Sequence, residues 1–395
     1  MGKILFRILL LIGLSAAPLS AAKNCPSRLS SFLHPVGDAP FFWAVELRGF
    51  DHLVDGLNYT YFGIGGWLRF EASENLSLDL EAVYRPKRYG DCREAEDLSP
   101  FQLRTFSLNA SLEGPAVDIR LGRQEIIRGS GLVLNDFFDA VSTEASLFGV
   151  DVSAGAGILA LPAAKESLYC QKCFFYEYRS GWKGLCRSEY GDYGMAYIDL
   201  TGSPGKRHRL GLLYMKTWAV EPGFSSHTLS VHGNWRLPGR VNLFTELATQ
   251  RPENHTGWVS GWHVEAIRSF RIKRAGSLTL RAGSLFGQAR GRLLFTPVFG
   301  NLYLGDRQHY SVRQGHILSF RARFTPVFFK AISLDAAYFS NPAHGLADPV
   351  TDEFDLGMEA RLPRSEKFRI RFVYSRSMTP SGPVHQARID TRINL

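Results

Sequence analysis

Polar and apolar residues alternate along most of the chain, and this alternation constrains the fold more than any other feature. The segment that starts at Leu76 reads Leu-Ser-Leu-Asp-Leu-Glu-Ala, with every second residue apolar. Successive side chains of a β-strand point to opposite faces of a sheet, so this period predicts strands with one apolar and one polar face. Beyond residue 22, no stretch approaches the ~18 consecutive apolar residues of a membrane-spanning helix. The sequence therefore predicts an all-β fold.

About 18 alternating segments follow one another, with connections that are alternately short and long. Segments 72–75 and 113–115 are short turns, whereas 86–100 and 287–309 are long loops. Bacterial outer-membrane barrels show this asymmetry and have an even number of strands. We therefore expect residues 23–395 to form one transmembrane antiparallel β-barrel of about 18 strands, with 16 as the alternative count. The expected strands are 43–49, 59–71, 76–82, 102–112, 116–127, 149–161, 168–178, 189–200, 209–217, 227–236, 241–250, 258–268, 277–286, 310–324, 332–340, 353–362, 368–377 and 385–395.

Residues 1–22 have the three parts of a secretory signal peptide. Lys3 and Arg7 form the basic end, residues 8–14 the apolar centre, and Ser20-Ala-Ala the small-residue cleavage site. The apolar centre is well short of the ~20 residues that a membrane-spanning helix needs. The full sequence has 46 basic and 37 acidic residues, so loss of Lys3 and Arg7 leaves 44 against 37, a net charge of +7. We expect an exported, basic protein located in a bacterial outer membrane.

The five cysteines are an odd set, so at least one cannot pair within the chain. They are Cys25, Cys92, Cys170, Cys173 and Cys186. Because an exported chain meets an oxidising compartment, we expect a disulfide from Cys186 to Cys170 or Cys173. The Cys170-Gln-Lys-Cys173 spacing also suits a metal, but no second such pair or histidine pair follows at zinc-finger distance. We therefore expect no metal and no cofactor.

Arginines recur on the polar face of the expected strands, where a barrel would turn them towards its interior. The opposite orientation costs ~2–4 kcal/mol for each arginine at the membrane midplane. The expected pore-lining arginines are Arg48, Arg69, Arg104, Arg120, Arg281, Arg313, Arg321, Arg323, Arg369, Arg371, Arg388 and Arg392. Acidic residues share this face, namely Glu46, Asp79, Glu81, Asp118, Asp335, Glu359 and Asp390. Two interpretations stay open: the arginines attract anions, or they pair with the acids and hold the wall. The basic excess in 369–392 favours a lumen that prefers anions.

The alternation breaks in residues 121–141, where a strand runs into Gly129-Ser-Gly131 and then a mixed apolar and polar segment. This segment is too long for a hairpin turn, so we expect a loop, 128–148, that folds back and narrows the pore. In one interpretation, Arg123, Gln124 and Arg128 lie at the pore. In the same interpretation, Asn135, Asp136 and Asp139 shape the loop. The other has Phe137 and Phe138 fill a structural gap while the acids cap turns.

This stretch resembles the signature region of the outer-membrane alginate-export porins, in which Gly-Arg-Gln-Glu leads through glycines to Phe-Asp-Gly/Ala-Val. The matching residues are Gly122, Arg123, Gln124, Glu125, Gly129, Phe138, Asp139, Ala140 and Val141. The resemblance implies a basic lumen that passes an acidic polysaccharide such as alginate outwards. Together with the arginines, it predicts a porin for passive diffusion or export of anionic solutes. The alternatives are a barrel enzyme that acts on lipid and a non-conducting surface or adhesion barrel.

The last residues alternate from Ala387 to Leu395, which predicts a closing strand whose apolar face meets lipid. Such a strand resembles the signal read by the barrel-assembly machinery, although Leu395 stands where Phe is usual. The expected partners are this machinery, outer-membrane lipid and an anionic solute or polysaccharide. Nucleic acid is not expected, because the arginines are spread by twos over many strands. No Gly-x-Ser-x-Gly motif is present, and the lone histidines His232 and His263 suit wall positions, so no enzyme is expected.

Overall fold

The computed structural model describes the strands of the chain and several of their connections. The described residues are 34–36, 39–54, 57–84, 87–89, 101–112, 117–159, 193–205, 207–219, 225–253, 255–290, 293–294, 316–327, 332–340, 352–361, 368–379 and 382–394. Several expectations fall on other residues and lie outside the described part. These are the signal peptide 1–22, all five cysteines with their disulfide, the strand 168–178, Arg313 and Leu395.

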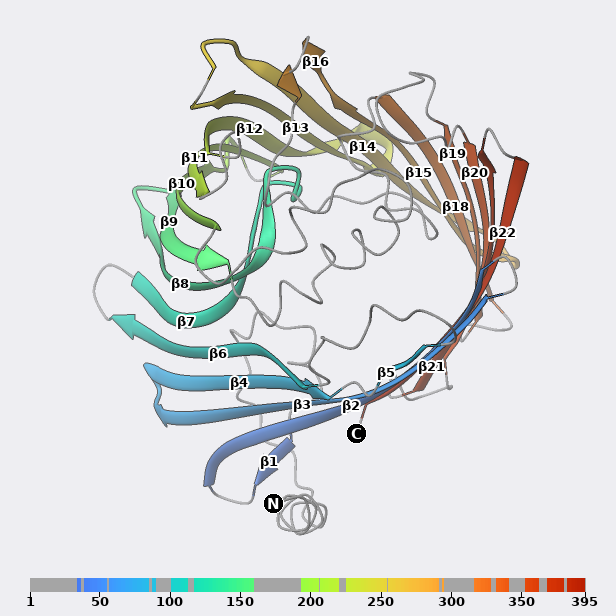
Figure 1. The fold of residues 1–395 in the computed structure, drawn as a ribbon, viewed down its shortest axis with the longest axis horizontal. Coiled ribbons are helices and arrows are strands. Elements are labelled where there is room, and N and C mark those ends of the chain that lie inside the picture. Colours follow the sequence, from blue (N-terminus) through green and yellow to red (C-terminus); the bar gives the residue numbers. More distant parts are fainter. Residues whose placement is uncertain are drawn as a thin grey trace.

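The strands form one antiparallel sheet that closes on itself (Figure 1). The sheet has 20 strands, and two of them, β1 (His34–Val36) and β5 (Lys87–Tyr89), have only three residues, which leaves 18 long strands. The first and last long strands, β2 and β22, pair with each other and close the ring. The long strands are β2 (Ala39–Val54), β3 (Leu57–Ser73), β4 (Leu76–Tyr84), β6 (Phe101–Leu112), β7 (Val117–Arg128), β8 (Leu134–Leu147), β9 (Val150–Leu159), β10 (Tyr193–Gly202), β11 (His208–Ala219), β12 (Ser226–Leu237), β13 (Val241–Pro252), β14 (Val259–Ile272), β15 (Gly276–Gly287), β18 (His316–Pro326), β19 (Ile332–Ser340), β20 (Asp352–Arg361), β21 (Phe368–Thr379) and β22 (Gly382–Asn394).

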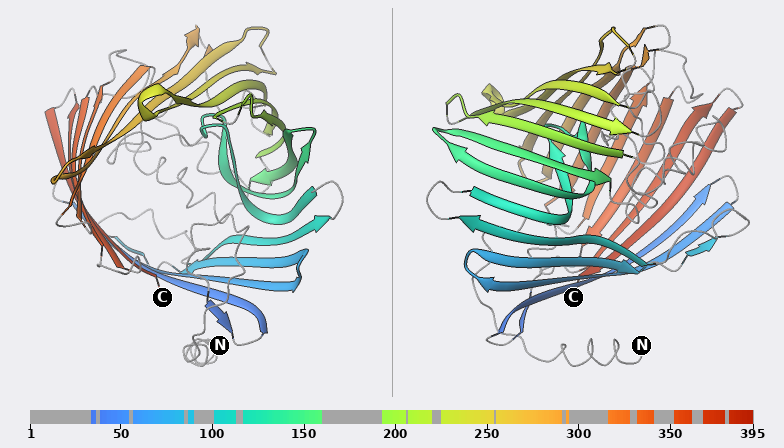
Figure 2. Two further views of the ribbon diagram at one scale, coloured as in Figure 1. Left: turned by 180° about the vertical axis from the view of Figure 1, so that it is seen from behind. Right: turned by 60° about the vertical axis from the view of Figure 1, so that its left-hand side comes forward.

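The predicted all-β antiparallel barrel of 18 strands is therefore confirmed. A separate two-residue pair, β16 (Ala289–Arg290) and β17 (Leu293–Leu294), lies apart from the main sheet. Figure 2 shows the same curved wall from behind and from the side. Among the described residues, no helix is long and apolar enough to cross a membrane.

The outer face of the wall is apolar, as the alternation predicts. Leu212, Val231 and Leu247 lie opposite one another on β11, β12 and β13, and all three are exposed. The alternate residues of the same strands, such as Ser230 and Glu246, are buried on the inner side. Burying these polar groups inside and exposing leucine outside is the inverse of a water-soluble sandwich, and it fits a wall surrounded by lipid.

Aromatic side chains lie on the outer face near both ends of the strands. At the end with the long connections, the rings of Trp262 and Phe286 stack with centroids 4.0 Å apart, and Trp218 and Trp258 are exposed. At the other end, Phe41 and Phe70 lie 4.7 Å apart and Arg268 covers the ring of Phe270. Two aromatic belts that flank an apolar band are typical of transmembrane barrels.

The segment 128–148 is not a long loop, which corrects the prediction. It forms a hairpin in which β7 and β8 pair from Val117↔Ala145 to Arg128↔Leu134, with only residues 129–133 in the turn. The chain reverses in so few residues because Gly129 and Gly131 adopt positive φ angles of 61° and 83°, which glycine reaches without steric cost. The strand β8 belongs to the count of 18. The loop expected at 51–58 is also largely strand, since β2 runs to Val54 and β3 starts at Leu57.

The far half of this hairpin leaves the wall and curves into the barrel (Figure 1). The strand β6 pairs with β7 only between Leu112↔Val117 and Phe106↔Arg123. At the point of departure, Gly122 has a φ of 116°, and a Cβ there would lie 2.2 Å from the carbonyl oxygen of Phe106. Both end-on views place the tip of the hairpin inside the ring, beside the inner faces of β10 to β13.

Candidate functional site

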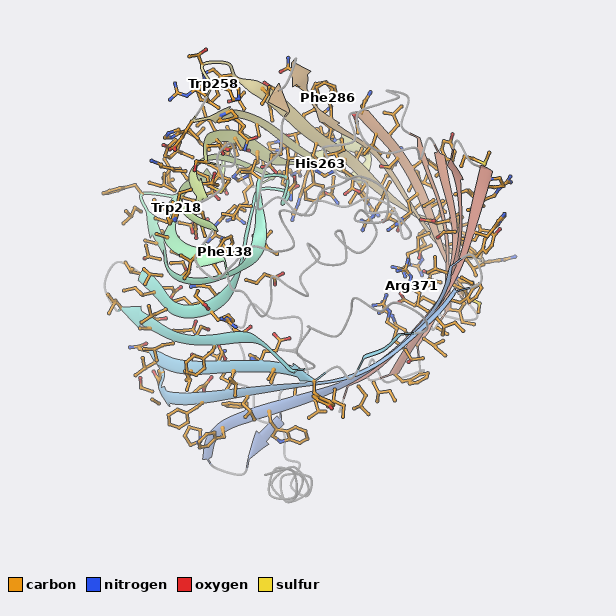
Figure 3. The ribbon with its side chains drawn as sticks, viewed as in Figure 1. Phe138, Trp218, Trp258, His263, Phe286 and Arg371 are labelled. Atoms are coloured by element: carbon orange, nitrogen blue, oxygen red, sulfur yellow. The ribbon has the colours of Figure 1, made fainter. Side chains whose placement is uncertain are left out.

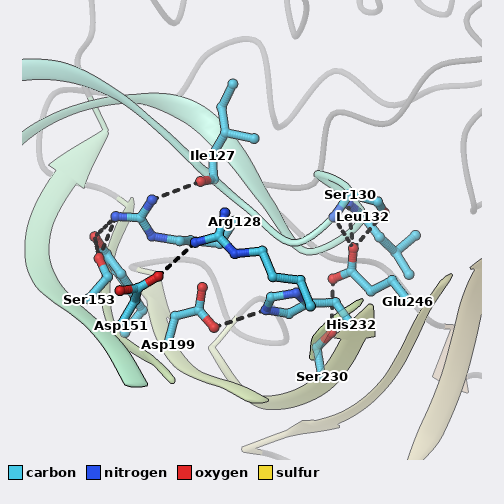
Figure 4. A network of polar contacts seen from close by, with 12 residues as sticks. Ile127, Arg128, Ser130, Leu132, Asp151, Ser153, Asp199, Ser230, His232 and Glu246 are labelled. Carbon is cyan, nitrogen blue, oxygen red and sulfur yellow. Dashed lines mark hydrogen bonds and ion pairs between the residues drawn. The ribbon is translucent and has the colours of Figure 1, made fainter. Parts of the chain in front are cut away.

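A buried carboxylate anchors the tip of the hairpin to the wall (Figure 4). Glu246 on β13 is 1% exposed, and its Oε2 accepts hydrogen bonds from the Ser130 backbone N–H at 2.7 Å and the Ser130 hydroxyl at 2.5 Å. The backbone N–H of Leu132 lies 3.4 Å from the same oxygen, and the Ser230 hydroxyl donates to Oε1 at 2.9 Å. Any side chain at Gly129 would collide with this carboxylate. The glycines of the turn thus let the backbone approach Glu246 closely.

Arg128 supplies a second anchor at the base of the tip. Its Nη2 donates to Glu144 Oε1 at 2.6 Å, to the Tyr197 hydroxyl at 3.0 Å and to the Ser153 hydroxyl. The guanidinium also lies over the Tyr197 ring, 5.3 Å from its centroid. These partners come from β8, β9 and β10, so the charge of Arg128 is engaged by the wall. This differs from the predicted place of Arg128 at the pore.

One face of the hairpin packs against the inner wall. Gln124 is 1% exposed, donates to the Ala140 carbonyl at 3.0 Å and accepts from the Ser142 hydroxyl at 2.7 Å. Phe138 and Leu134 are also fully buried, and Figure 3 places Phe138 between the hairpin and the wall. Gln124 is thus buried between the hairpin and the wall, which differs from its predicted place at the pore. The burial of Phe138 fits the interpretation in which Phe137 and Phe138 fill a structural gap, whereas the side chain of Phe137 lies outside the described part.

The opposite face of the hairpin is the one that also carries the exposed residues Leu121 and Val141. Arg123 and Asp139 lie directly across from each other on β7 and β8 and form a two-point ion pair, with Nε–Oδ1 and Nη2–Oδ2 distances of 2.8 Å each. Because side chains alternate along a strand, Arg123 lies on the other face from Gln124. Asn135 and Asp136 are part of β8, and their side chains lie outside the described part.

A cluster of arginines on the inner side of β18 to β21 surrounds one carboxylate. Glu359 on β20 is almost fully buried, with Arg323 Nη2 at 3.1 Å, Arg361 Nη2 at 2.8 Å and Arg369 Nη2 at 2.5 Å from its oxygens. The three arginine side chains are 38%, 46% and 36% exposed, so they reach water. Glu359 alone cannot neutralise three guanidinium groups, and Asp335 on β19, directly opposite Arg323, is a further acidic residue beside them. We call Arg323, Glu359, Arg361 and Arg369 the arginine cluster.

Further arginines extend the arginine cluster along the wall. Arg361, Arg369, Arg392 and Arg48 follow one another in register across β20, β21, β22 and β2. Arg361 is not among the expected pore-lining arginines, although its place two residues after Glu359 puts both on one face of β20. The side chains of Arg48, Arg388 and Arg392 lie outside the described part.

Three more of the predicted arginines lie on the same side of the barrel. Arg281 and Arg321 are directly opposite each other on β15 and β18, and Arg281 lies 3.9 Å from Glu265. Arg371 is paired in register with Glu359, and Figure 3 shows it on the inner side of β21. The wall from β15 to β22 is therefore rich in positive charge.

The wall from β3 to β7 is balanced instead. Arg69 pairs with Glu71 at 3.0 Å and lies 4.0 Å from Asp79. Arg120 donates to Asn109 at 2.7 Å, and Asn109 donates to Asp79 at 2.7 Å. Arg69 and Arg120 thus belong to ladders that hold the wall, as the second interpretation had it. Arg104 lies at an irregularity of β6, where Glu81 pairs with Thr105 and Ala82 with Leu103, and its side chain lies outside the described part.

The remaining polar groups near the hairpin are wall contacts. His232 Nε2 lies 2.9 Å from Asp199 Oδ1, and His263 is 4% exposed on β14. Within the ranges that the structure describes, no group of three His, Cys, Asp or Glu side chains is arranged to hold a metal ion. The exposed charges of the arginine cluster are guanidinium groups, which bind carboxylates and phosphates in two-point geometry.

These features define an 18-strand barrel with an inward hairpin and an arginine-rich wall. No protein-family model matches the sequence, and no curated protein matches it. Among solved structures, the outer membrane protein OpdK from Pseudomonas aeruginosa is 13% identical with a TM-score of 0.59, over 90% of this chain and 98% of OpdK. The structure of OpdK with vanillate is 12% identical with a TM-score of 0.61, over 90% of this chain and 98% of that one. OccAB4 from Acinetobacter baumannii is 9% identical with a TM-score of 0.57, over 90% of this chain and 97% of OccAB4.

At such low identities the similarity shows the fold alone. It supports the porin-type barrel that the motif at 122–141 implied. It gives no support to the finer resemblance to alginate exporters, because the three structures share an architecture with this chain and little sequence.

Proposed function

We propose that this chain is a bacterial outer-membrane channel through which small anionic solutes diffuse passively. The arginine cluster carries the proposal, since three partly exposed guanidinium groups gather around one buried carboxylate, Glu359, on the inner wall. Arginine rings in a pore attract anions and repel cations. The apolar outer face between two aromatic belts and the fold shared with OpdK support the membrane location.

The inward hairpin would narrow the passage opposite this wall. Its anchored face is closed by the packing of Gln124 and Phe138 against the inner wall. An anion that passes between the hairpin and the arginine cluster meets positive charge from the wall. The proposed substrate class is therefore small carboxylates. The motif at 122–141 adds an acidic polysaccharide such as alginate as the second candidate substrate. The two candidates differ in the size of the transported molecule.

Planar-bilayer recordings test the proposal. We expect the purified protein to form channels whose reversal potential in a salt gradient shows anion preference. Neutralising the arginine cluster in Arg323→Gln/Arg361→Gln/Arg369→Gln should reduce that preference strongly. The matched control, Arg69→Gln, removes a charge of the balanced wall and should change it little.

Other outcomes decide against the proposal. Cation preference of the unmodified protein would refute it. Absence of conductance favours the non-conducting surface barrel, and cleavage of phospholipid or lipopolysaccharide by the detergent-solubilised protein favours the barrel enzyme. In channels that do conduct, block by small carboxylates and not by alginate oligomers identifies the first candidate substrate.

A further inference from the structure

Basic side chains form a row on the outer, membrane-facing side of the wall. Lys216, His227 and Arg251 lie directly opposite one another on β11, β12 and β13. They share their face with the exposed residues Tyr214 and Leu229, whereas the alternate positions are buried towards the lumen. We call Lys216, His227 and Arg251 the outer basic row. A charged row on an apolar face is the feature that needs an explanation.

The position of the outer basic row along the strands indicates the level of the lipid headgroups. All three residues lie near the ends of their strands, next to the connections 220–225 and 253–258. Basic side chains on a barrel's lipid face are costly at the midplane and nearly free of cost near the interface. Trp218 and Trp258 are exposed beside the row, and tryptophan concentrates at membrane interfaces (Figure 3).

Contacts within the row hold its side chains in place. Glu253 Oε1 lies 3.3 Å from Lys216 Nζ and 3.8 Å from His227 Nε2. The other ring nitrogen of His227 is hydrogen-bonded to the Tyr214 hydroxyl at 2.8 Å. The guanidinium of Arg251 lies 5.4 Å from the ring centroid of Trp258. The row is therefore partly preorganised, and its one carboxylate leaves at least one positive charge unbalanced.

We propose that the outer basic row binds the phosphate group of an anionic lipid in the surrounding leaflet. Charge complementarity selects phosphate, and the surface below the row selects a lipid over a soluble anion. Leu212, Leu229 and Val231 are exposed there, next to the row on the side of the membrane centre. A molecule with a phosphorylated head and apolar chains matches both surfaces at once. The proposal rests on the membrane location proposed above and is independent of conduction.

Native mass spectrometry of the detergent-solubilised protein provides the test, with bisphosphorylated lipid A as the probe and its dephosphorylated form as the lipid control. The variant Lys216→Gln/Arg251→Gln should bind lipid A about thirtyfold more weakly, from the usual contribution of two basic residues near an anionic surface. The matched control is Arg268→Gln, an outward arginine over the Phe270 ring (4.5 Å) at the opposite belt. It should bind like the unmodified protein, and Lys216→Arg/Arg251→Lys should retain binding.

Three results would overturn the proposal: equal binding by the double Gln variant, equal binding of the dephosphorylated lipid, or displacement of lipid A by inorganic phosphate at equal concentration. Bilayer conductance of the same preparations separates the two proposals. If the protein conducts anions but binds lipid A no better than its dephosphorylated form, the proposed lipid site is refuted and the proposed channel is not. A protein that binds the phosphate but never conducts refutes the channel alone.

Discussion

Removal of the Glu246 carboxylate should release the hairpin tip inside the barrel. In Glu246→Ala, the Ser130 N–H and hydroxyl lose an acceptor at 2.7 and 2.5 Å. Hydrogen bonds to a charged group each contribute about 1.5–3 kcal/mol, so the two bonds amount to about 3–6 kcal/mol. The alanine also removes the cost of burying a carboxylate, which offsets part of this sum. We take about 3 kcal/mol as the net loss, which raises the detached fraction about 150-fold.

Single-channel recording detects this change. The unmodified protein should show a steady current, and Glu246→Ala should switch frequently between conductance levels as the tip leaves and rejoins the wall. The matched control is Ser230→Ala, which removes a partner of Glu246 that comes from the wall and leaves both Ser130 bonds intact. Its current should stay as steady as that of the unmodified protein. The variant Glu246→Gln should resemble alanine if its amide turns an N–H towards the Ser130 N–H.

Limited proteolysis gives an independent measurement on the same variants. Residues 129–133 should become susceptible to cleavage in Glu246→Ala and stay protected in Ser230→Ala. A Glu246→Ala variant whose current is as steady, and whose residues 129–133 resist cleavage as well, as in the unmodified protein would refute this prediction. In that case the Arg128 contacts and the packing of Phe138 and Leu134 hold the tip without Glu246.

Two further predictions concern the hairpin. Phe138→Ala should lower the free energy of unfolding by about 3–5 kcal/mol, because a fully buried ring is replaced by a cavity. Urea titration in detergent measures this loss. A loss below ~1 kcal/mol, the typical effect of a point substitution, would contradict the packing of Phe138. Gly122→Ala should reduce the yield of heat-modifiable folded barrel, since its Cβ would lie 2.2 Å from the Phe106 carbonyl oxygen at a φ of 116°; Gly66→Ala, where a Cβ meets nothing within 4 Å, should fold normally.

The barrel was predictable because its signal is local. A strand that separates lipid from a polar lumen alternates within every few residues, as at Leu76–Ala82, so no knowledge of distant contacts is needed. The strand β8 escaped prediction because its first half faces no lipid. There, Phe138 packs on the inner wall and Asp139 pairs with Arg123, so tertiary packing decides which side of the strand is apolar and the period of two is lost.

The anchor at Glu246 was not predictable, since 116 residues separate it from Ser130 and nothing local marks the pair. A subtler signal was present on the wall itself. The segment from Leu212 to Met215 reads Leu-Leu-Tyr-Met, and its two inward residues, Leu213 and Met215, are fully buried. A strand that is apolar on both faces must be covered on both. In a barrel, such a run predicts that something folds into the lumen against it, and the hairpin beside β10 to β13 meets that requirement. Loss of alternation in two separate segments thus predicts their contact, because each lacks the water or lipid that would otherwise impose the period of two.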